Sequence, residues 1–240
     1  MSESIAVIIP AYCESENIIE LCTEIIIFAP NANIIIVDDS PDELTMQKVK
    51  TYAHPQVQIT HRSTKNGRGS AVIEGIKQMI HGDHDFFLEI DADFSHPPSQ
   101  IPDLIAYLKE NNLDLLIASR YLKDSQILNW PLSRRIFSRC ANRLTKYFLK
   151  VPVSDYTNGF RLYSKTATNE LLNSCGKLGS GFIALSEILV NLHYRDYKIG
   201  EVPTIFKNRI RGQSSLSIKE IWNAIVGLNK IYKLKRTLEK

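Results

Sequence analysis

The regular alternation of short apolar runs with helical segments constrains the fold of this chain more than any other feature. Residues 5–9 (IAVII) and 33–37 (NIIIV) are dominated by β-branched side chains, typical of strands buried on both faces. Between them, the sequence S-E-N-I-I-E starting at Ser15 offers a helix cap followed by early acids. Strand, helix and strand at this spacing predict a βαβ unit with parallel strands.

The same rhythm continues through the first half of the chain. It predicts strands over residues 56–62, within 86–93 and within 113–121, and helices over 71–80 and 101–110. Five strands alternating with helices indicate an α/β fold with a Rossmann-like, mostly parallel sheet flanked by helices. In such sheets, ligands bind beyond the carboxyl ends of the strands. The charged side chains expected at that edge are Asp38, Asp39, Asp91, Asp93 and Arg120.

Composition is that of an ordinary globular protein. The 240 residues include 44% apolar and 23% charged side chains, which excludes a disordered or fibrous chain. We expect one domain over residues 1–216 and a C-terminal amphipathic basic helix over 217–240. The net charge is only +3, but basic residues gather from Arg134 onward, and this asymmetry indicates an anionic partner.

The sequence gives no sign of export, a disulfide framework or a membrane-spanning helix. The N-terminal segment has no basic stretch before its first strand, so we expect no signal peptide. No apolar run approaches the ~20 residues that a spanning helix needs. The cysteines lack paired CxxC spacing, which argues against a disulfide scaffold or a zinc site and fits a reducing cytosol. They are Cys13, Cys22, Cys140 and Cys175.

Two amphipathic helices are predicted in the C-terminal half. The first runs from about Leu132 to Leu149 and carries Arg135, Arg139 and Arg143 in one i, i+4 row. Such a helix can lie on an anionic surface, or it can simply present a solvated basic face. The second, near residues 217–236, ends in KLKR and either packs on its own core or docks on a membrane surface or a partner.

Acidic side chains end one predicted strand, in FFLEIDADFSHPP (residues 86–98). Period two aims Asp91 and Asp93 to the same side of the chain. Carboxylates held this close repel each other, and Mg²⁺ or Mn²⁺ bound with a substrate's phosphates is the usual remedy. Glu89 lies further back and is interpreted as structural. His96 has metal-ligand chemistry, but the two prolines after it favour a turn.

Several polar residues allow both a structural and a functional interpretation. Asp38 and Asp39 begin the stretch DDSPD, which is also good turn chemistry. The stretch KNGRGS (residues 65–70) is either a loop before a helix or a phosphate site at that helix's N-terminus. For Asp155 and Glu187 we favour capping or pairing over a role as a base.

Nine segments in order resemble one known family of enzymes. The chain is similar to the polyprenyl-phosphate mannose synthases (dolichyl-phosphate mannosyltransferases) of glycosyltransferase family 2, which have the GT-A fold. The segments span nearly the whole chain, which makes their combination far more specific than any single one. They are VIIPAYCESENI, IIIVDDSPD, KNGRGSAVIEG, EIDADFSHPP, ASRY, NWPLSRR, DYTNGFRLY, GFIALSEIL and VPTIFKNRIRGQSSL.

The resemblance implies roles on the nucleotide side of the site. Pro10, Tyr12 and Glu14 would embrace the nucleoside, and Asp38 and Asp39 would read its base or ribose.

By the same resemblance, the metal on the diphosphate would be held by Asp91 and Asp93. Asp93 would count as catalytic, and Ala92 between them would contact the donor. Ser95 stands where the family commonly has a glutamine as third ligand, so this contact would be weaker or replaced by water.

On the acceptor side, the resemblance implies that Arg120 and Arg134 are catalytic and grip a phosphate. Ser215 stands where the family often has a lysine, which puts one phosphate contact in doubt. Arg211 and Ser214 remain near that contact as substrate-binding residues, and Arg209 would close over the site from a mobile loop.

The implied reaction is metal-dependent, inverting transfer of a hexose, with mannose from GDP-mannose as the leading expectation, to a polyprenyl phosphate. The alternatives are a UDP-sugar donor such as UDP-glucose, a saccharide hydroxyl acceptor, or a catalytically silent nucleotide-sugar binding protein. We expect peripheral association with the cytoplasmic face of a membrane, directly or through a small membrane partner protein. Nucleic acid is not an expected partner.

Overall fold

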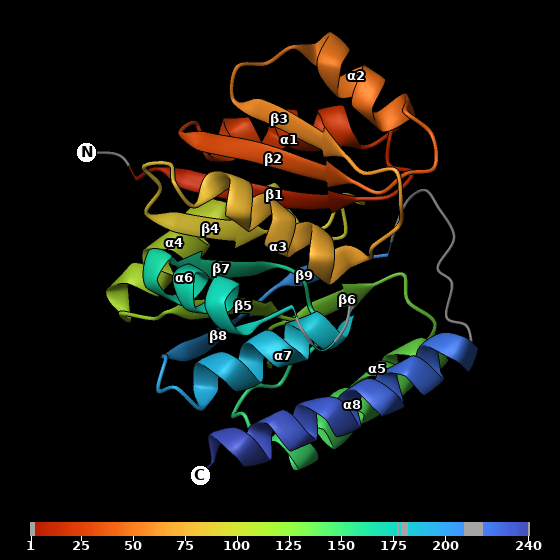
Figure 1. The fold of residues 1–240 in the computed structure, drawn as a ribbon, viewed down its shortest axis with the longest axis vertical. Helices are drawn as coiled ribbons and strands as arrows, with labels where there is room; N and C mark the ends of the chain where they lie inside the picture. Colours follow the sequence, from red (N-terminus) through yellow and green to blue (C-terminus); the bar gives the residue numbers. More distant parts are fainter. Residues whose placement is uncertain (1–2, 177, 179–181, 209–217, 240) are drawn as a thin grey trace.

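The computed structural model of the chain describes residues 3–176, 178, 182–208 and 218–239 (Figure 1). Its centre is a seven-stranded sheet in the order β3-β2-β1-β4-β7-β5-β8. The strands of this sheet are β1 (Ile5–Ala11), β2 (Ala32–Asp38), β3 (Val57–His61), β4 (Phe86–Glu89), β5 (Leu115–Ser119), β7 (Arg161–Ser164) and β8 (Ile199–Pro203).

The first four strands of the sheet form the predicted parallel half. β1 pairs in parallel with both β2 and β4, and β2 pairs in parallel with β3. The register sets Ala11 opposite Asp38 and Ile8 opposite Glu89. The carboxyl ends of β1, β2 and β4 therefore lie at one edge, where the sequence predicts the ligand to bind.

One strand of the sheet has the opposite direction, and neither it nor β8 was predicted. β7 lies between β4 and β5 and is antiparallel to both, whereas β8 runs parallel to β5. Its insertion makes the sheet mixed, although five strands were correctly predicted and most pairs are parallel. A separate two-stranded ribbon joins β6 (Gln126–Leu128) to β9 (Ile205–Lys207).

Helices cover both faces of the sheet and enclose two apolar cores. One core receives side chains from α3 (Arg68–Met79), α6 (Lys165–Ser174) and α7 (Phe182–His193), and the other from α1 (Ile18–Phe28) and α4 (Ile101–Glu110). The short helix α2 (Leu44–Tyr52) lies outside β3 and contributes Val49 to the second core, and a 3₁₀ turn, Pro98–Gln100, leads into α4.

α3 approaches the sheet closely at Gly75. A Cβ built on this residue would lie 2.7 Å from Cγ2 of Ile8, so the helix could not pack this tightly with any larger side chain here.

Two long helices lie side by side at the end of the molecule away from α2 (Figure 1). α5 (Leu132–Leu149) has the predicted bounds, and α8 (Ile218–Leu238) agrees closely with the predicted 217–236. Lys235 Nζ donates to the Phe148 carbonyl at 3.1 Å, and the rings of Phe148 and Tyr232 meet edge to face. Ile231 of α8 is buried in the first core, so α8 packs on the domain to which it is joined. The division of the chain at residue 216 stays a prediction.

Candidate active site

A guanidinium that the sequence reasoning did not single out lies among the acidic residues. Arg68 begins α3, and its Nε donates to Asp91 Oδ1 at 2.8 Å while its Nη1 pairs with Glu89. Burial by itself lowers the pKa of Arg68, but the carboxylates of Asp91 and Glu89 outweigh burial and raise it above its usual value. Glu89 is only 1% exposed, and its other oxygen accepts a hydrogen bond from the Tyr163 hydroxyl at 2.9 Å. Glu89 thus has a structural role. The chain itself supplies one positive charge beside these acids, the guanidinium of Arg68.

Gly159 makes room for this guanidinium. Nη2 of Arg68 donates to the Gly159 carbonyl at 3.2 Å, and a Cβ on Gly159 would lie 1.9 Å from that same nitrogen. The stretch YTNGF therefore packs against the side chain of Arg68, and it can do so because position 159 is a glycine.

The residues after β4 offer donors that suit a hard divalent cation. Asp91 is partly exposed and Asp93 is nearly buried, with its Oδ1 accepting from the Ser95 amide at 3.1 Å; Ala92 between them is buried. Ser95 Oγ is buried and has no hydrogen-bond partner among the described residues, as expected of an atom that receives a ligand from outside the chain. Carboxylate and hydroxyl oxygens are ligands that Mg²⁺ and Mn²⁺ accept, so this donor set fits.

Protein ligands alone would leave such a cation incompletely coordinated. Within the described residues, no three His, Cys, Asp or Glu side chains converge closely enough to hold a metal. A cation at Asp91 and Asp93 would complete its shell with substrate phosphate and water, which is usual for Mg²⁺.

His96 is enclosed beside the acidic pair. Its Nε2 lies 3.8 Å from Asp91 Oδ2, and neither ring nitrogen has a hydrogen-bond partner in the described part of the chain. The ring packs against Phe160 and Phe206. Burial lowers the pKa of His96 to about 4, so the imidazole is neutral at pH 7.

Asp38 and Asp39 anchor two loops at the end of β2. Asp38 is fully buried and accepts from the Ser40 amide at 3.2 Å and shares a 2.9 Å contact with His61 Nδ1. This is the turn chemistry that DDSPD suggested. Asp39 receives Nε and Nη2 of Arg62 at 2.5 and 2.7 Å.

Asp39 also fixes the start of the KNGRGS loop. Its Oδ2 accepts from the backbone amides of Asn66 and Gly67, each at 3.1 Å. Each aspartate thus already accepts hydrogen bonds from the protein itself. A role for either one in reading the base or ribose stays a prediction.

The predicted nucleoside residues follow β1. Pro10 lies in β1, and Tyr12 just beyond it is 43% exposed, with Lys65 Nζ 3.6 Å from its ring centroid. Glu14 accepts from Asn17 Nδ2 at 2.7 Å at the start of α1. Tyr12 thus offers an exposed aromatic ring at the carboxyl edge, with Lys65 over one of its faces and the other face suited to stacking on a base.

Beyond β5, Arg120 is held by a buried carboxylate. Its Nε and Nη2 donate to Asp155 at 2.8 Å each, and Nη2 also donates to Thr157 Oγ1 at 2.7 Å. Burial raises the pKa of Asp155, but the Arg120 guanidinium and its hydrogen bonds outweigh burial and hold that pKa below its usual value. Asp155 is therefore a charged structural partner, as the sequence favoured.

Trp130 brings the two predicted acceptor arginines together. The guanidinium carbon of Arg134 lies 4.2 Å from the Trp130 ring centroid and that of Arg120 lies 5.6 Å from it. Trp130 was not predicted as a site residue, although it lies within the quoted segment NWPLSRR. The other residues predicted on the acceptor side lie outside the described part of the chain. These are Arg209, Arg211, Ser214 and Ser215.

The strand order and the charged carboxyl edge define an α/β protein of the class that binds its ligands beyond the carboxyl ends of the strands. The family model described as "Glycosyl transferase family 2" matches residues 6–172. The chain belongs to this family, which confirms both the resemblance seen in the sequence and the class of enzyme, a glycosyltransferase.

Two curated relatives are similar over most of the chain. A dolichol-phosphate mannosyltransferase of Pyrococcus furiosus is 36% identical over 239 residues, which are 96% of this chain and 63% of that protein. An undecaprenyl-phosphate mannosyltransferase of Micrococcus luteus is 30% identical over 230 residues, which are 93% of this chain and 91% of that protein. The chain thus spans somewhat under two thirds of the first relative and nearly all of the second.

Solved structures confirm the GT-A fold. Glucosyl-3-phosphoglycerate synthase from Mycobacterium tuberculosis, in complex with phosphoglyceric acid, has a TM-score of 0.70 at 18% identity and covers 96% of this chain and 80% of its own. The same enzyme crystallised with Mn²⁺, UDP-glucose and phosphoglyceric acid has a TM-score of 0.69, also at 18% identity, over 96% of this chain and 80% of its own.

Proposed function

We propose that the chain transfers a hexose, mannose from GDP-mannose, to a polyprenyl monophosphate. One observation carries the proposal: the carboxyl edge of one sheet presents a metal-type acidic pair and, beside it, two arginines gathered at Trp130. Asp91 and Asp93 suit a donor diphosphate with its cation, and the guanidinium forks suit a second phosphate. The names of both curated relatives support a polyprenyl-phosphate acceptor and a mannosyl donor.

The acceptor explains why the site needs no general base. A phosphate monoester has a second pKa near ~6 and is largely dianionic at neutral pH, so it attacks without losing a proton first. Asp155, the enclosed carboxylate nearest to this side, is bound by Arg120 and so has no role as a base. In-line attack on the anomeric carbon then inverts its configuration.

Each part of the site has one task in this reaction. Tyr12 stacks on the base, and Arg134, half-buried at the start of α5, binds the acceptor phosphate together with Arg120, since both guanidinium groups lie near the Trp130 ring. Asp91 and Asp93 would hold a divalent cation, which would supply charge stabilisation for the departing nucleoside diphosphate.

A labelled-donor screen tests the proposal. Purified chain is incubated with a short polyprenyl phosphate and labelled GDP-mannose, UDP-glucose or another nucleotide sugar, with Mn²⁺ or with chelator, and label is followed into the organic phase. We expect organic-soluble label from GDP-mannose with Mn²⁺ only. Label from UDP-glucose alone would favour the UDP-sugar alternative, and donor binding without transfer would favour a silent binding protein. Equal transfer in chelator would refute the cation's role.

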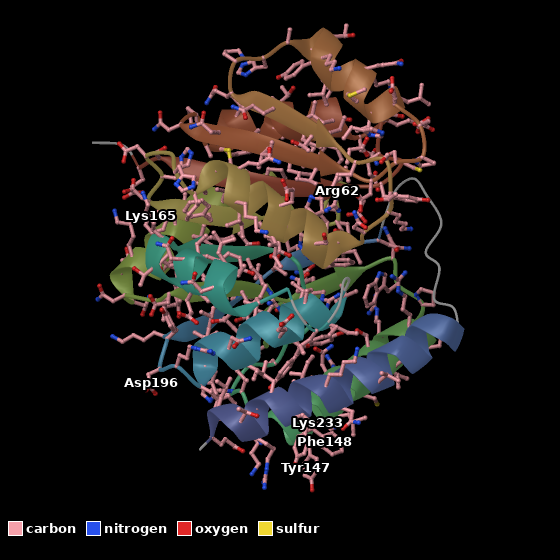
Figure 2. The ribbon with its side chains drawn as sticks, in the orientation of Figure 1. Arg62, Tyr147, Phe148, Lys165, Asp196 and Lys233 are labelled. Carbon is pink, nitrogen blue, oxygen red and sulfur yellow. The ribbon has the colours of Figure 1, made fainter. Side chains whose placement is uncertain are left out.

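We further propose that the outer face of α5 lies on an anionic membrane surface, which holds the lipid acceptor. Within the described residues, no helix is long and apolar enough to cross a membrane. α5 has no acidic residue, and its exposed apolar side chains lie among basic ones. Leu132 and Tyr147 are 72% and 74% exposed, and Figure 2 shows Tyr147, Phe148 and Lys233 at the end of the molecule away from Arg62. Since Arg134 belongs to α5, the same helix joins this face to the candidate acceptor site.

Liposome binding tests the membrane proposal. Each basic residue near an anionic surface contributes about 1 kcal/mol, so replacing Arg135, Arg139 and Arg143 with serine should weaken binding roughly 100-fold. The control replaces three exposed lysines elsewhere and loses the same charge, and we expect it to bind much as the wild type does. Equal binding by both triple variants would reject the assignment of this face. The control lysines are Lys48, Lys50 and Lys77.

A further inference from the structure

The side chain of Arg68 is fixed more firmly than a surface cation would be. Nε donates to Asp91, Nη1 pairs with Glu89 and Nη2 donates to the Gly159 carbonyl. Each nitrogen of the guanidinium fork thus has its own acceptor. These acceptors come from β4, from the segment that follows it and from the loop before β7, so three parts of the chain converge on one side chain.

The charges near Arg68 become balanced when one divalent cation is added. Glu89, Asp91 and Asp93 carry three formal negative charges and Arg68 carries one positive charge, and three less one leaves a formal charge of −2. Without Arg68, one cation would leave the acidic cluster with an excess negative charge next to an incoming diphosphate. Arg68 therefore matches the cluster to a single divalent ion.

The two oxygens of Asp91 have different surroundings. Oδ1 accepts from Arg68 at 2.8 Å, whereas Oδ2 is directed toward His96, with 3.8 Å to its Nε2. We propose that Arg68 is the positioning residue of the metal site, because it holds Asp91 by Oδ1 and so fixes the orientation in which this carboxylate meets the divalent cation. The inference rests on the proposed function, because it concerns the same diphosphate site.

Stability alone gives a weak reason for this arrangement. A buried ion pair contributes little net stability, because desolvation offsets the attraction between its charges. The fold nevertheless keeps Glu89 buried, supplies Tyr163 to its second oxygen and leaves position 159 without a side chain. Partners that orient a metal's ligands typically change metal affinity about 10–100-fold, which is an effect large enough to be measured here.

The test compares Mn²⁺ binding by the wild-type chain and by the double variant Arg68→Met/Glu89→Gln. This variant removes one positive and one negative charge, so the net charge of the site is unchanged, and the new glutamine amide still offers an oxygen to Tyr163. Mn²⁺ is titrated with saturating GDP or UDP, whichever the wild type binds, and free Mn²⁺ is followed by electron paramagnetic resonance. We expect the Kd for Mn²⁺ to rise about 10–100-fold while the melting temperature stays close to that of the wild type.

A second variant, Gly159→Ala, changes no charge and displaces Arg68 by steric contact alone. The new Cβ would lie within 3.1 Å of Asp91 Oδ1 as well as 1.9 Å from Arg68 Nη2, so we expect the same direction of change in the Kd.

The control is Arg195→Met/Glu170→Gln, which removes a 3.0 Å ion pair beyond the end of α7 and should leave the Kd unchanged. An unchanged Kd in both site variants would overturn the proposal while leaving the metal assignment intact. A wild-type chain that binds no Mn²⁺ with either nucleotide would overturn both.

Discussion

Replacing Arg120 with methionine should strongly destabilise the fold, because Asp155 would remain as a buried charge without its cation. Asp155 is 0% exposed and receives both Nε and Nη2 of Arg120 at 2.8 Å. Removing one partner of such a pair costs about 3–5 kcal/mol. The Thr157 and Asn158 amides also donate to Asp155, at 3.2 and 3.1 Å, and they keep the carboxylate in place while it loses its counter-charge.

This magnitude corresponds to a large change in melting temperature. For a chain of this size, each kcal/mol shifts the melting temperature by about 2–4 °C, so Arg120→Met should lower it by roughly 6–20 °C. Scanning calorimetry measures the shift, and urea unfolding at 25 °C measures the free energy.

The double variant Arg120→Met/Asp155→Asn tests the cause. The new asparagine keeps an oxygen for the Thr157 and Asn158 amides but carries no charge, so the double variant should recover most of the stability lost by Arg120→Met. A loss below about 1 kcal/mol in the single variant, or an equal loss in the double variant, would refute the reasoning from an uncompensated charge.

Three further outcomes are expected. Asp93→Asn should abolish transfer in the labelled-donor assay while leaving the circular dichroism spectrum and melting temperature near wild type; substantial remaining activity contradicts its assignment. Because the pKa of Asp155 is lowered in the folded chain, its contribution to the free energy of unfolding is complete above about pH 4 and is lost as the pH falls through the pKa of the folded state. Urea unfolding from pH 3 to 7 should show this loss in the wild type and a smaller loss in Arg120→Met/Asp155→Asn. Gly75→Ala should destabilise the chain by about 1–3 kcal/mol in urea, because its Cβ would lie 2.7 Å from Ile8 Cγ2 and crowding outweighs the better helix propensity of alanine; an unchanged midpoint would mean that α3 can move off the sheet at little cost.

Patterns that are local in sequence predicted the elements well. The repeated short apolar runs predicted the first five strands, and the spacing of apolar and basic residues predicted α5 over Leu132–Leu149. β7 was missed because its sequence, RLYS, contains no continuous apolar run and its place depends on pairing with both β4 and β5. No local period records such an insertion.

The candidate site was predicted in the same uneven way. Asp91 and Asp93 were identified because a D-x-D at a strand end is a local signal. Arg68 was missed because its contacts are with Glu89 and Gly159, which lie 21 and 91 residues further along the chain. Asp39 shows the converse difficulty: the sequence left both a turn and a ligand-reading role open, and it did not indicate the pairing with Arg62 that the fold adds.

The antiparallel strand β7 sets a condition on how the chain is made as well as on its finished shape. Strands β1 to β5 leave the ribosome before β7, yet β5 joins β4 only through β7. A nascent chain that ends after β5 therefore has β3, β2, β1 and β4 ready to pair, with an unpaired apolar edge at β4. Synthesis must add about 40 further residues before Tyr163 reaches Glu89. During that interval the unpaired edge of β4 is open to pairing with other chains.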